Sequence, residues 1–143
     1  MSVQFADEIL LKNGGGEAKG SVALAGKVVG LYFSAHWCPP CCRFTPILKE
    51  FHAKNADKFE VVFVSSDETK EEQENYLKEA HGNWYYMPFD EDKINAVGEK
   101  YGIDAIPSLV IVKPDGTAID CNGVEGVQET PDAVMEKWIK ESQ

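Results

Sequence analysis

The sequence has 143 residues, of which 14 are basic and 24 acidic, so its formal net charge is −10. Such a balance argues against binding to nucleic acid or to an anionic membrane surface, because both attract basic patches. The length predicts one domain, residues 1–143, that can bury a sizeable core. Met1–Lys12 has no signal-peptide pattern, and no stretch is apolar for long enough to span a bilayer. We therefore expect a cytoplasmic protein, and the adjacent pair among its four cysteines does not suggest a secreted disulfide framework.

The first part of the chain predicts short elements that lead to one long buried strand. Asp7–Leu11 is predicted as a short helix that ends at the glycine run Gly14–Gly16. Ser21–Leu24 is predicted as a strand, with a turn at Gly26–Lys27. Val28–Ser34 is a continuous apolar run, which is typical of a strand buried on both faces of a parallel sheet. We take Val28–Ser34 as the first central strand.

Two cysteines three residues apart follow this strand directly. Apolar residues then recur at helical spacing, at positions 44, 47, 48 and 51, so Cys38 is predicted to lie at a helix N-terminus. Unpaired N–H groups and the helix dipole stabilise an anion there, and the thiolate is the reactive form of cysteine. Pro39 and Pro40 carry no N–H, so the first N–H that can meet the Cys38 sulfur belongs to Cys41.

Zinc is the main alternative for such a cysteine pair. A structural zinc site needs four ligands, as a rule from a second cysteine pair or a histidine pair. The remaining candidates do not stand at ligand spacing: Cys42, Cys121, His36, His52 and His81. We therefore expect no metal, and a CxxC beside a βαβ pattern indicates a redox-active dithiol.

The rest of the chain alternates predicted helices and strands. Glu60–Ser66 is a second buried strand, which completes a βαβ unit. The aromatic segment Asn83–Asp90 is predicted as a loop or an edge strand. The other predicted elements are helices Asp67–Ala80 and Asp92–Tyr101, a hairpin of Leu109–Lys113 and Thr117–Cys121 around Pro114–Gly116, and a final helix that Thr130–Asp132 cap.

Several motifs in combination resemble the tryparedoxin and nucleoredoxin group of the thioredoxin superfamily. They are Tyr32-Phe33-Ser34-Ala35-His36-Trp37-Cys38-Pro39-Pro40-Cys41, Phe44-Thr45-Pro46, Val62–Glu68 and Pro88-Phe89-Asp90. The resemblance runs from about Ile9 to Ile119. It implies an α/β thioredoxin fold, a central mixed β-sheet with helices on both faces.

The resemblance also implies roles for particular residues. Cys38 would attack a substrate disulfide and Cys41 would resolve the mixed disulfide, with the Cys38–Cys41 disulfide as the redox centre and no other cofactor. Pro107 would be a cis-proline that faces the dithiol. The substrate-docking surface would comprise Trp37, Pro39, Pro40, Ile106 and Pro107.

The sequence departs from the group's pattern at the residue after the second cysteine. The group commonly has Arg there, whereas this chain has Cys42 and then Arg43. One residue turns a helical side chain by about 100°, which leaves open whether Arg43 can pair with Glu68. Tyr32 stands where thioredoxin itself has a buried Asp. The proton acceptor for Cys41 is then water, Glu68 or another group.

Three further residues lie near the motif or at a strand end, and two of them have an alternative role. We expect Cys42 to be an exposed spectator, with glutathionylation or an intermolecular disulfide as the alternative. We expect His36 to be solvated, with a positive charge that tunes Cys38 as the alternative. Cys121 at a strand end is predicted to be a small buried hydrophobe.

The favoured function is a monomeric dithiol–disulfide oxidoreductase that reduces disulfides in proteins, peroxidases included. Its electron donor is expected to be a low-molecular-weight dithiol or a reductase, because the chain has no dinucleotide-binding fingerprint. The alternative is a redox-regulated binding module of the nucleoredoxin type that docks a signalling partner.

Overall fold

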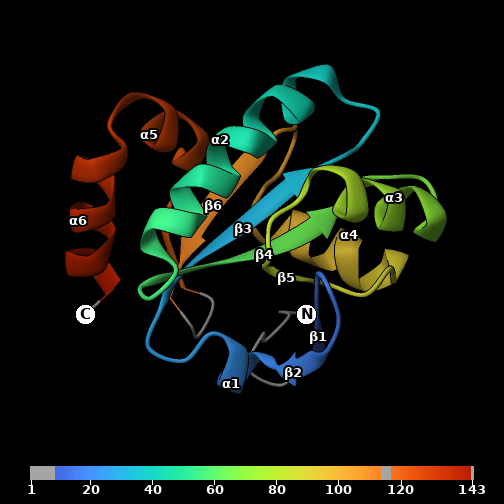
Figure 1. Cartoon of the computed structure of the whole chain (residues 1–143), viewed down its shortest axis with the longest axis horizontal. Coiled ribbons are helices and arrows are strands. Elements are labelled where there is room, and N and C mark those ends of the chain that lie inside the picture. The colour runs from blue at the N-terminus through green and yellow to red at the C-terminus, as the bar shows by residue number, and fades with distance from the viewer. Residues whose placement is uncertain (1–8, 114–116, 143) are drawn as a thin grey trace.

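A seven-stranded mixed β-sheet forms the centre of the molecule, in the order β2-β1-β5-β4-β3-β6-β7. The computed structural model, drawn in Figure 1, describes residues 9–113 and 117–142. The strands are β1 (Ile9–Lys12), β2 (Glu17–Lys19), β3 (Val28–Ser34), β4 (Phe59–Ser65), β5 (Tyr85–Tyr86), β6 (Ser108–Val112) and β7 (Ala118–Asp120). The helices are α1 (Gly20–Ala23), α2 (Pro39–Asn55), α3 (Lys70–Ala80), α4 (Glu91–Lys100), α5 (Gly123–Glu129) and α6 (Pro131–Ser142).

The two central strands explain the continuous apolar runs of the sequence. β3 and β4 pair in parallel, and all seven residues of each are buried. A strand covered on both faces needs apolar side chains on both, so alternation disappears. On its other edge β3 pairs with β6 in the antiparallel direction, so the sheet is mixed as predicted.

The two faces of the sheet differ in their side chains. The face covered by α2, α3, α5 and α6 is aromatic, and it includes Tyr32, Phe44, Phe59, Phe63, Tyr76, Trp84 and Trp138. The face covered by α1 and α4 is mostly aliphatic, with Leu10, Leu24, Val29, Leu31, Val62, Val64, Val97 and Val110. In Figure 1, α2 lies across the front of the sheet, above β3 and β6.

Two predictions for the N-terminal part are wrong. Within the predicted helix Asp7–Leu11, the residues from Ile9 onward form β1, which pairs with β2 and β5. The predicted strand Ser21–Leu24 is largely the short helix α1. A short apolar run is compatible with a helix and with a strand. Pairing with other strands makes β1 a strand. Asp7 and Glu8 lie outside the described residues.

The remaining elements follow the prediction with two exceptions. Tyr85–Tyr86 form β5, which lies between β1 and β4 inside the sheet and not at its edge. Helix α5 was not predicted. The hairpin of β6 and β7 is present, although its predicted turn, Pro114–Gly116, lies outside the described residues. In the described part of the chain, no helix is both long and apolar enough to cross a membrane.

Candidate active site

The candidate site lies where β3 ends and α2 begins. Cys38 is the N-cap residue of α2, and the Cys41 N–H donates a hydrogen bond to the Cys38 sulfur at 3.4 Å. Pro39 and Pro40 occupy the first two helical positions and are exposed. The predicted contact between the Cys38 sulfur and the Cys41 N–H is therefore confirmed.

Both cysteines of the motif are buried. Cys41 is 0% exposed, and Cys38 is only 5% exposed although a helix N-cap position favours an exposed side chain, so an exposed Cys38 would be the wrong expectation. Ala35 and Ile106 pack against the two cysteines and cover them. The Cys38 thiol lies 4.0 Å from the Ile106 carbonyl oxygen, and the Ile106–Pro107 peptide bond is cis. The sequence motif and the residues before β6 thus meet at one place.

The Cys41 thiol is held in its neutral form. Burial, and after it a side-chain hydrogen bond with Cys38, raise the pKa of Cys41 to about 11. A side-chain hydrogen bond with Ser34 acts in the opposite direction and lowers the pKa of Cys41. Burial disfavours the thiolate of Cys41, and Ser34 partly offsets this effect.

A network of buried hydroxyl groups lies beside and beneath Cys41. Thr45 Oγ1 is 2.7 Å from both Tyr32 Oη and Tyr76 Oη, and Ser34 Oγ is 2.6 Å from Tyr76 Oη. Thr45 and Tyr32 also donate to the Cys41 carbonyl oxygen, at 2.8 and 3.2 Å. We call Tyr32, Ser34, Thr45 and Tyr76 the hydroxyl network; no local signal in the sequence marks it as part of the site.

His81 lies under the same network, among aromatic rings. Its ring is 4.2 Å from that of Tyr76 and 4.4 Å from that of Phe63, measured between centroids. Trp84 Nε1 donates to His81 Nδ1 at 3.0 Å, while His81 Nε2 is buried and has no hydrogen-bond partner among the described residues. Burial lowers the pKa of His81 to about 3, so the imidazole stays neutral.

The outer side of the site is formed by exposed residues. Trp37 is 59% exposed, and its Nε1 donates to the Ser66 carbonyl oxygen at 3.3 Å. A surface hollow of about 320 Å³ beside Trp37 is lined by His36, Glu68 and Glu72. Trp37, Pro39 and Pro40 therefore form an apolar rim at the entrance to the dithiol.

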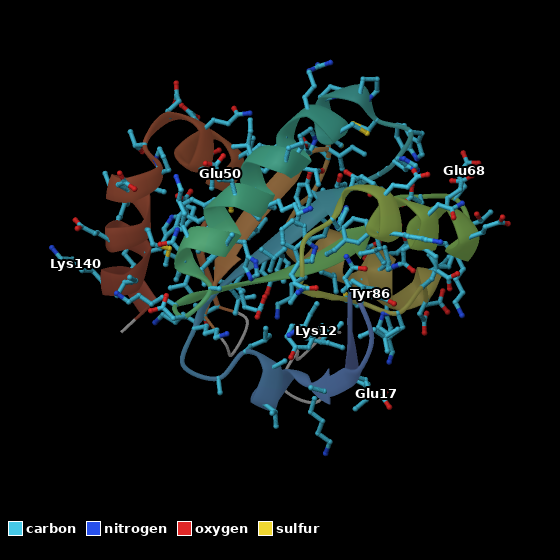
Figure 2. All side chains as sticks on the ribbon, in the orientation of Figure 1. Lys12, Glu17, Glu50, Glu68, Tyr86 and Lys140 are labelled. Carbon is cyan, nitrogen blue, oxygen red and sulfur yellow. The ribbon has the colours of Figure 1, made fainter. Side chains whose placement is uncertain are left out.

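The residues predicted to tune the dithiol do not gather around it. Glu68 projects outward before α3, as Figure 2 shows, and Arg43 is exposed on α2. Among the described residues, Arg43 forms no ion pair with Glu68. His36 is half-buried rather than solvated, because its ring stacks on Tyr76 at 5.0 Å and its Nε2 lies 3.1 Å from a Glu79 carboxylate oxygen.

The remaining cysteines lie at the surface. Cys42 is exposed, as predicted, and its thiol donates to the His36 carbonyl oxygen at 3.3 Å. Partial burial and the Cys38 and Asp67 charges raise the pKa of Cys42, which disfavours its thiolate. Cys121 is exposed, so its predicted burial is wrong: it follows the edge strand β7, where no further strand covers it. No group of three or more metal-ligating side chains occurs among the residues the structure describes.

Fold and site together define a thioredoxin-like thiol–disulfide oxidoreductase, and comparison with known proteins agrees. A model of the thioredoxin-like family matches residues 26–118, and the chain belongs to this family. Tryparedoxin from Trypanosoma brucei brucei is 39% identical, over 90% of both chains. Nucleoredoxin-like protein 1 from Homo sapiens is 32% identical, over 96% of this chain and 72% of its own.

Solved structures share both the fold and much of the sequence. A thioredoxin from Wuchereria bancrofti is 46% identical and superposes with a TM-score of 0.83, over 98% of this chain and 99% of its own. A tryparedoxin II complexed with glutathionylspermidine is 35% identical, with a TM-score of 0.79, over 87% of this chain and 88% of its own. The thioredoxin fold and the redox class of this chain follow from these similarities.

Proposed function

We propose that this protein reduces disulfide bonds in other proteins through Cys38 and Cys41. The observation that carries the proposal is the position of Cys38 at the N-cap of α2, where its sulfur accepts the Cys41 N–H at 3.4 Å. A hydrogen bond to sulfur and the helix dipole both stabilise the negative charge that an attacking sulfur carries. Peroxidases that form disulfides during turnover belong to this substrate class.

The reaction consists of two exchanges. The Cys38 thiolate attacks one sulfur of the substrate disulfide; the substrate S–S bond breaks, and a mixed disulfide on Cys38 forms while one substrate thiolate leaves. Cys41 then attacks the Cys38 sulfur, the Cys38–Cys41 disulfide forms, and the second substrate thiolate leaves and takes up a proton. The order follows from accessibility, because Cys41 is fully buried while Cys38 adjoins the exposed Pro39.

The oxidised protein must be reduced again by an external thiol. A solved tryparedoxin II is complexed with glutathionylspermidine, which supports a low-molecular-weight thiol of this kind as the electron donor. The exposed rim at Trp37 offers such a donor or a protein substrate an apolar surface beside the Cys38 sulfur. A reductase protein is the other class of donor.

Reduction of insulin disulfides with dithiothreitol tests the proposal. We expect catalytic turnover, seen as faster precipitation of the insulin B chain, and loss of that turnover on Cys38→Ser. Similarity to nucleoredoxin-like protein 1 favours a second function, a redox-regulated binding module that docks a signalling partner. Such a module would precipitate insulin no faster than dithiothreitol alone.

A further inference from the structure

The resolving role proposed for Cys41 needs a thiolate at a fully buried position. Neither carboxylate that follows β4 is placed to accept the proton that Cys41 must lose. Glu68 is exposed on the outer side of the site. Asp67 is buried, but its carboxylate accepts hydrogen bonds from the His36 N–H at 2.8 Å and from the Ser65 hydroxyl at 2.9 Å. Its contacts serve the loop that carries His36.

We propose that the hydroxyl network takes the place of an ionisable base: Ser34, positioned by Tyr76 and Thr45, donates a hydrogen bond that stabilises the Cys41 thiolate in the resolving step. This inference rests on the proposed function and assigns new residues to it. The network is anchored on Cys41 through its carbonyl oxygen, which accepts from Thr45 at 2.8 Å. A side-chain hydrogen bond with Ser34 lowers the pKa of the Cys41 thiol, and Tyr76 and Thr45 act through Ser34.

Each hydroxyl carries one proton, so the distances allow two donor directions along the chain. With Cys41 as a thiol, Ser34 donates to Tyr76, Tyr76 donates to Thr45, and Thr45 donates to the Cys41 carbonyl oxygen. The Ser34 oxygen can then accept the Cys41 S–H.

With Cys41 as a thiolate, rotation of the hydroxyls reverses the chain. Ser34 donates to the sulfur, Tyr76 donates to Ser34, and Thr45 donates to Tyr76. Tyr32 donates to Thr45, 2.7 Å away, in both directions. Each contact between two hydroxyls of the network therefore keeps one proton in both directions.

The network stays neutral throughout this exchange. Burial raises the pKa of Tyr32 and of Tyr76, so neither ring becomes an anion near neutral pH. The proton that Cys41 loses therefore goes to the substrate thiolate that leaves Cys38. The network contributes a hydrogen bond to the charged sulfur and no net proton.

The groups that face the Cys41 thiol come from three elements. Cys38, the N-cap residue of α2, is a titratable neighbour of the thiol, Tyr32 of β3 contacts the Cys41 carbonyl oxygen, and Tyr76 of α3 approaches the thiol through Ser34. The loop before β6 contributes the apolar Ile106. On the far side of Tyr76, His36 stacks on the ring and pairs with Glu79. His36 and Glu79 therefore act on Cys41 through Tyr76.

The test separates the two exchanges in one experiment. In a Cys42→Ser/Cys121→Ser background, the reduced protein is mixed in a stopped-flow instrument with excess 5,5′-dithiobis(2-nitrobenzoic acid). The first equivalent of the coloured thiolate reports attack by Cys38, and the second reports resolution by Cys41. Both phases are recorded from pH 6 to pH 10 for the background protein, Ser34→Ala, Tyr76→Phe, Thr45→Val and Thr45→Ser, and for Tyr86→Phe as a tyrosine control outside the network.

Ser34→Ala should slow the second phase about tenfold or more at pH 7 and displace its curve of rate against pH toward higher pH, because a hydrogen bond to a charged group is lost. The first phase should stay within about twofold, since Ser34 does not touch Cys38 in the proposed step. Thr45→Val and Tyr76→Phe should follow Ser34→Ala with smaller changes. Thr45→Ser keeps its hydroxyl and should match the background protein, as should Tyr86→Phe.

Unchanged second-phase rates at every pH from 6 to 10 in Ser34→Ala and Thr45→Val would overturn the network's role. Should Ser34→Ala fail to fold by circular dichroism, the contrast between Thr45→Val and Thr45→Ser decides, since both retain a small side chain there. If the background protein itself releases no second equivalent and reduces no insulin, the proposed function fails instead.

Discussion

The floor of the site and its rim are built from different kinds of residue. The floor consists of the hydroxyl network and His81, all buried among aromatic rings of α2, α3 and the sheet. The rim of Trp37, Pro39 and Pro40 is exposed, as are the neighbouring Cys42 and Glu68. Adjacent residues of one helix can belong to different regions: Cys41 faces the floor and Cys42 the solvent. The rim is therefore suited to contact partners, while the floor is suited to control the Cys41 thiol.

The largest expected effect comes from replacing each of the adjacent cysteines in turn. Cys41→Ser should accumulate a mixed disulfide with substrate protein through Cys38 and lose turnover, because no buried thiol remains to resolve it. Cys42→Ser should keep turnover within about twofold, because its sulfur lies on the outer side of α2 with a raised pKa. Non-reducing gels after mixing with oxidised insulin measure the adduct.

The double variant Cys41→Ser/Cys42→Ser serves as the control for this contrast. Accumulation of the adduct only in the double variant would show that Cys42 resolves the intermediate, and the distinction between floor and rim would then be wrong. Adduct formation by Cys38→Ser would reverse the roles of Cys38 and Cys41.

The next effect is the pH dependence of the resolving step. Only the thiolate attacks, and the pKa of Cys41 is about 11, so its reactive fraction rises about tenfold for each pH unit below that value. The single-turnover resolution rate should therefore increase from pH 7 to pH 10 and level off above pH 11. Acid quenching followed by mass spectrometry of the Cys38 adduct measures it. A rate independent of pH across this range would contradict a buried, neutral Cys41.

A smaller effect concerns stability, through the buried imidazole of the floor. The pKa of His81 falls from 6.5 to about 3 on folding, so the unfolded chain binds the proton first. The contribution of neutral His81 to the free energy of unfolding is fully present above pH 6.5. It decreases as the pH falls toward 3, with a slope of at most about 1.4 kcal/mol per pH unit. Urea unfolding of the wild type and of His81→Gln, at several pH values, measures the difference in slope.

His36 contributes to the same effect, because its charge is the second cause that lowers the pKa of His81, after burial. His36→Gln should therefore reduce the slope of unfolding free energy against pH by less than His81→Gln does. Equal slopes for the wild type and for His81→Gln would show that His81 does not bind its proton differentially.

The rim could be predicted from the sequence, whereas the floor could not. A cysteine pair after a buried strand fixes Cys38 at a helix N-cap through local rules of helix termini. The floor depends on long-range contacts: Ser34 and Tyr76 come from β3 and α3, and the pairing of β3 with β4 aligns them. Neither hydroxyl carries a local signal. Strand β1 was mistaken for a helix for a similar reason, because its partners lie elsewhere in the chain.

The smallest expected effect lies on the rim itself, at Trp37. Its side chain is 59% exposed, so Trp37→Ala should change the free energy of unfolding by no more than about 0.5 kcal/mol. The same exposed ring offers apolar contact to a docking protein, so KM for insulin should rise severalfold while kcat stays unchanged. The small disulfide used in the stopped-flow test should react at the wild-type rate. Ile47 is an exposed apolar residue of α2, so Ile47→Ala is the matched control and should alter none of these values. Equal KM values for wild type and Trp37→Ala would show that the rim does not dock substrate through this ring.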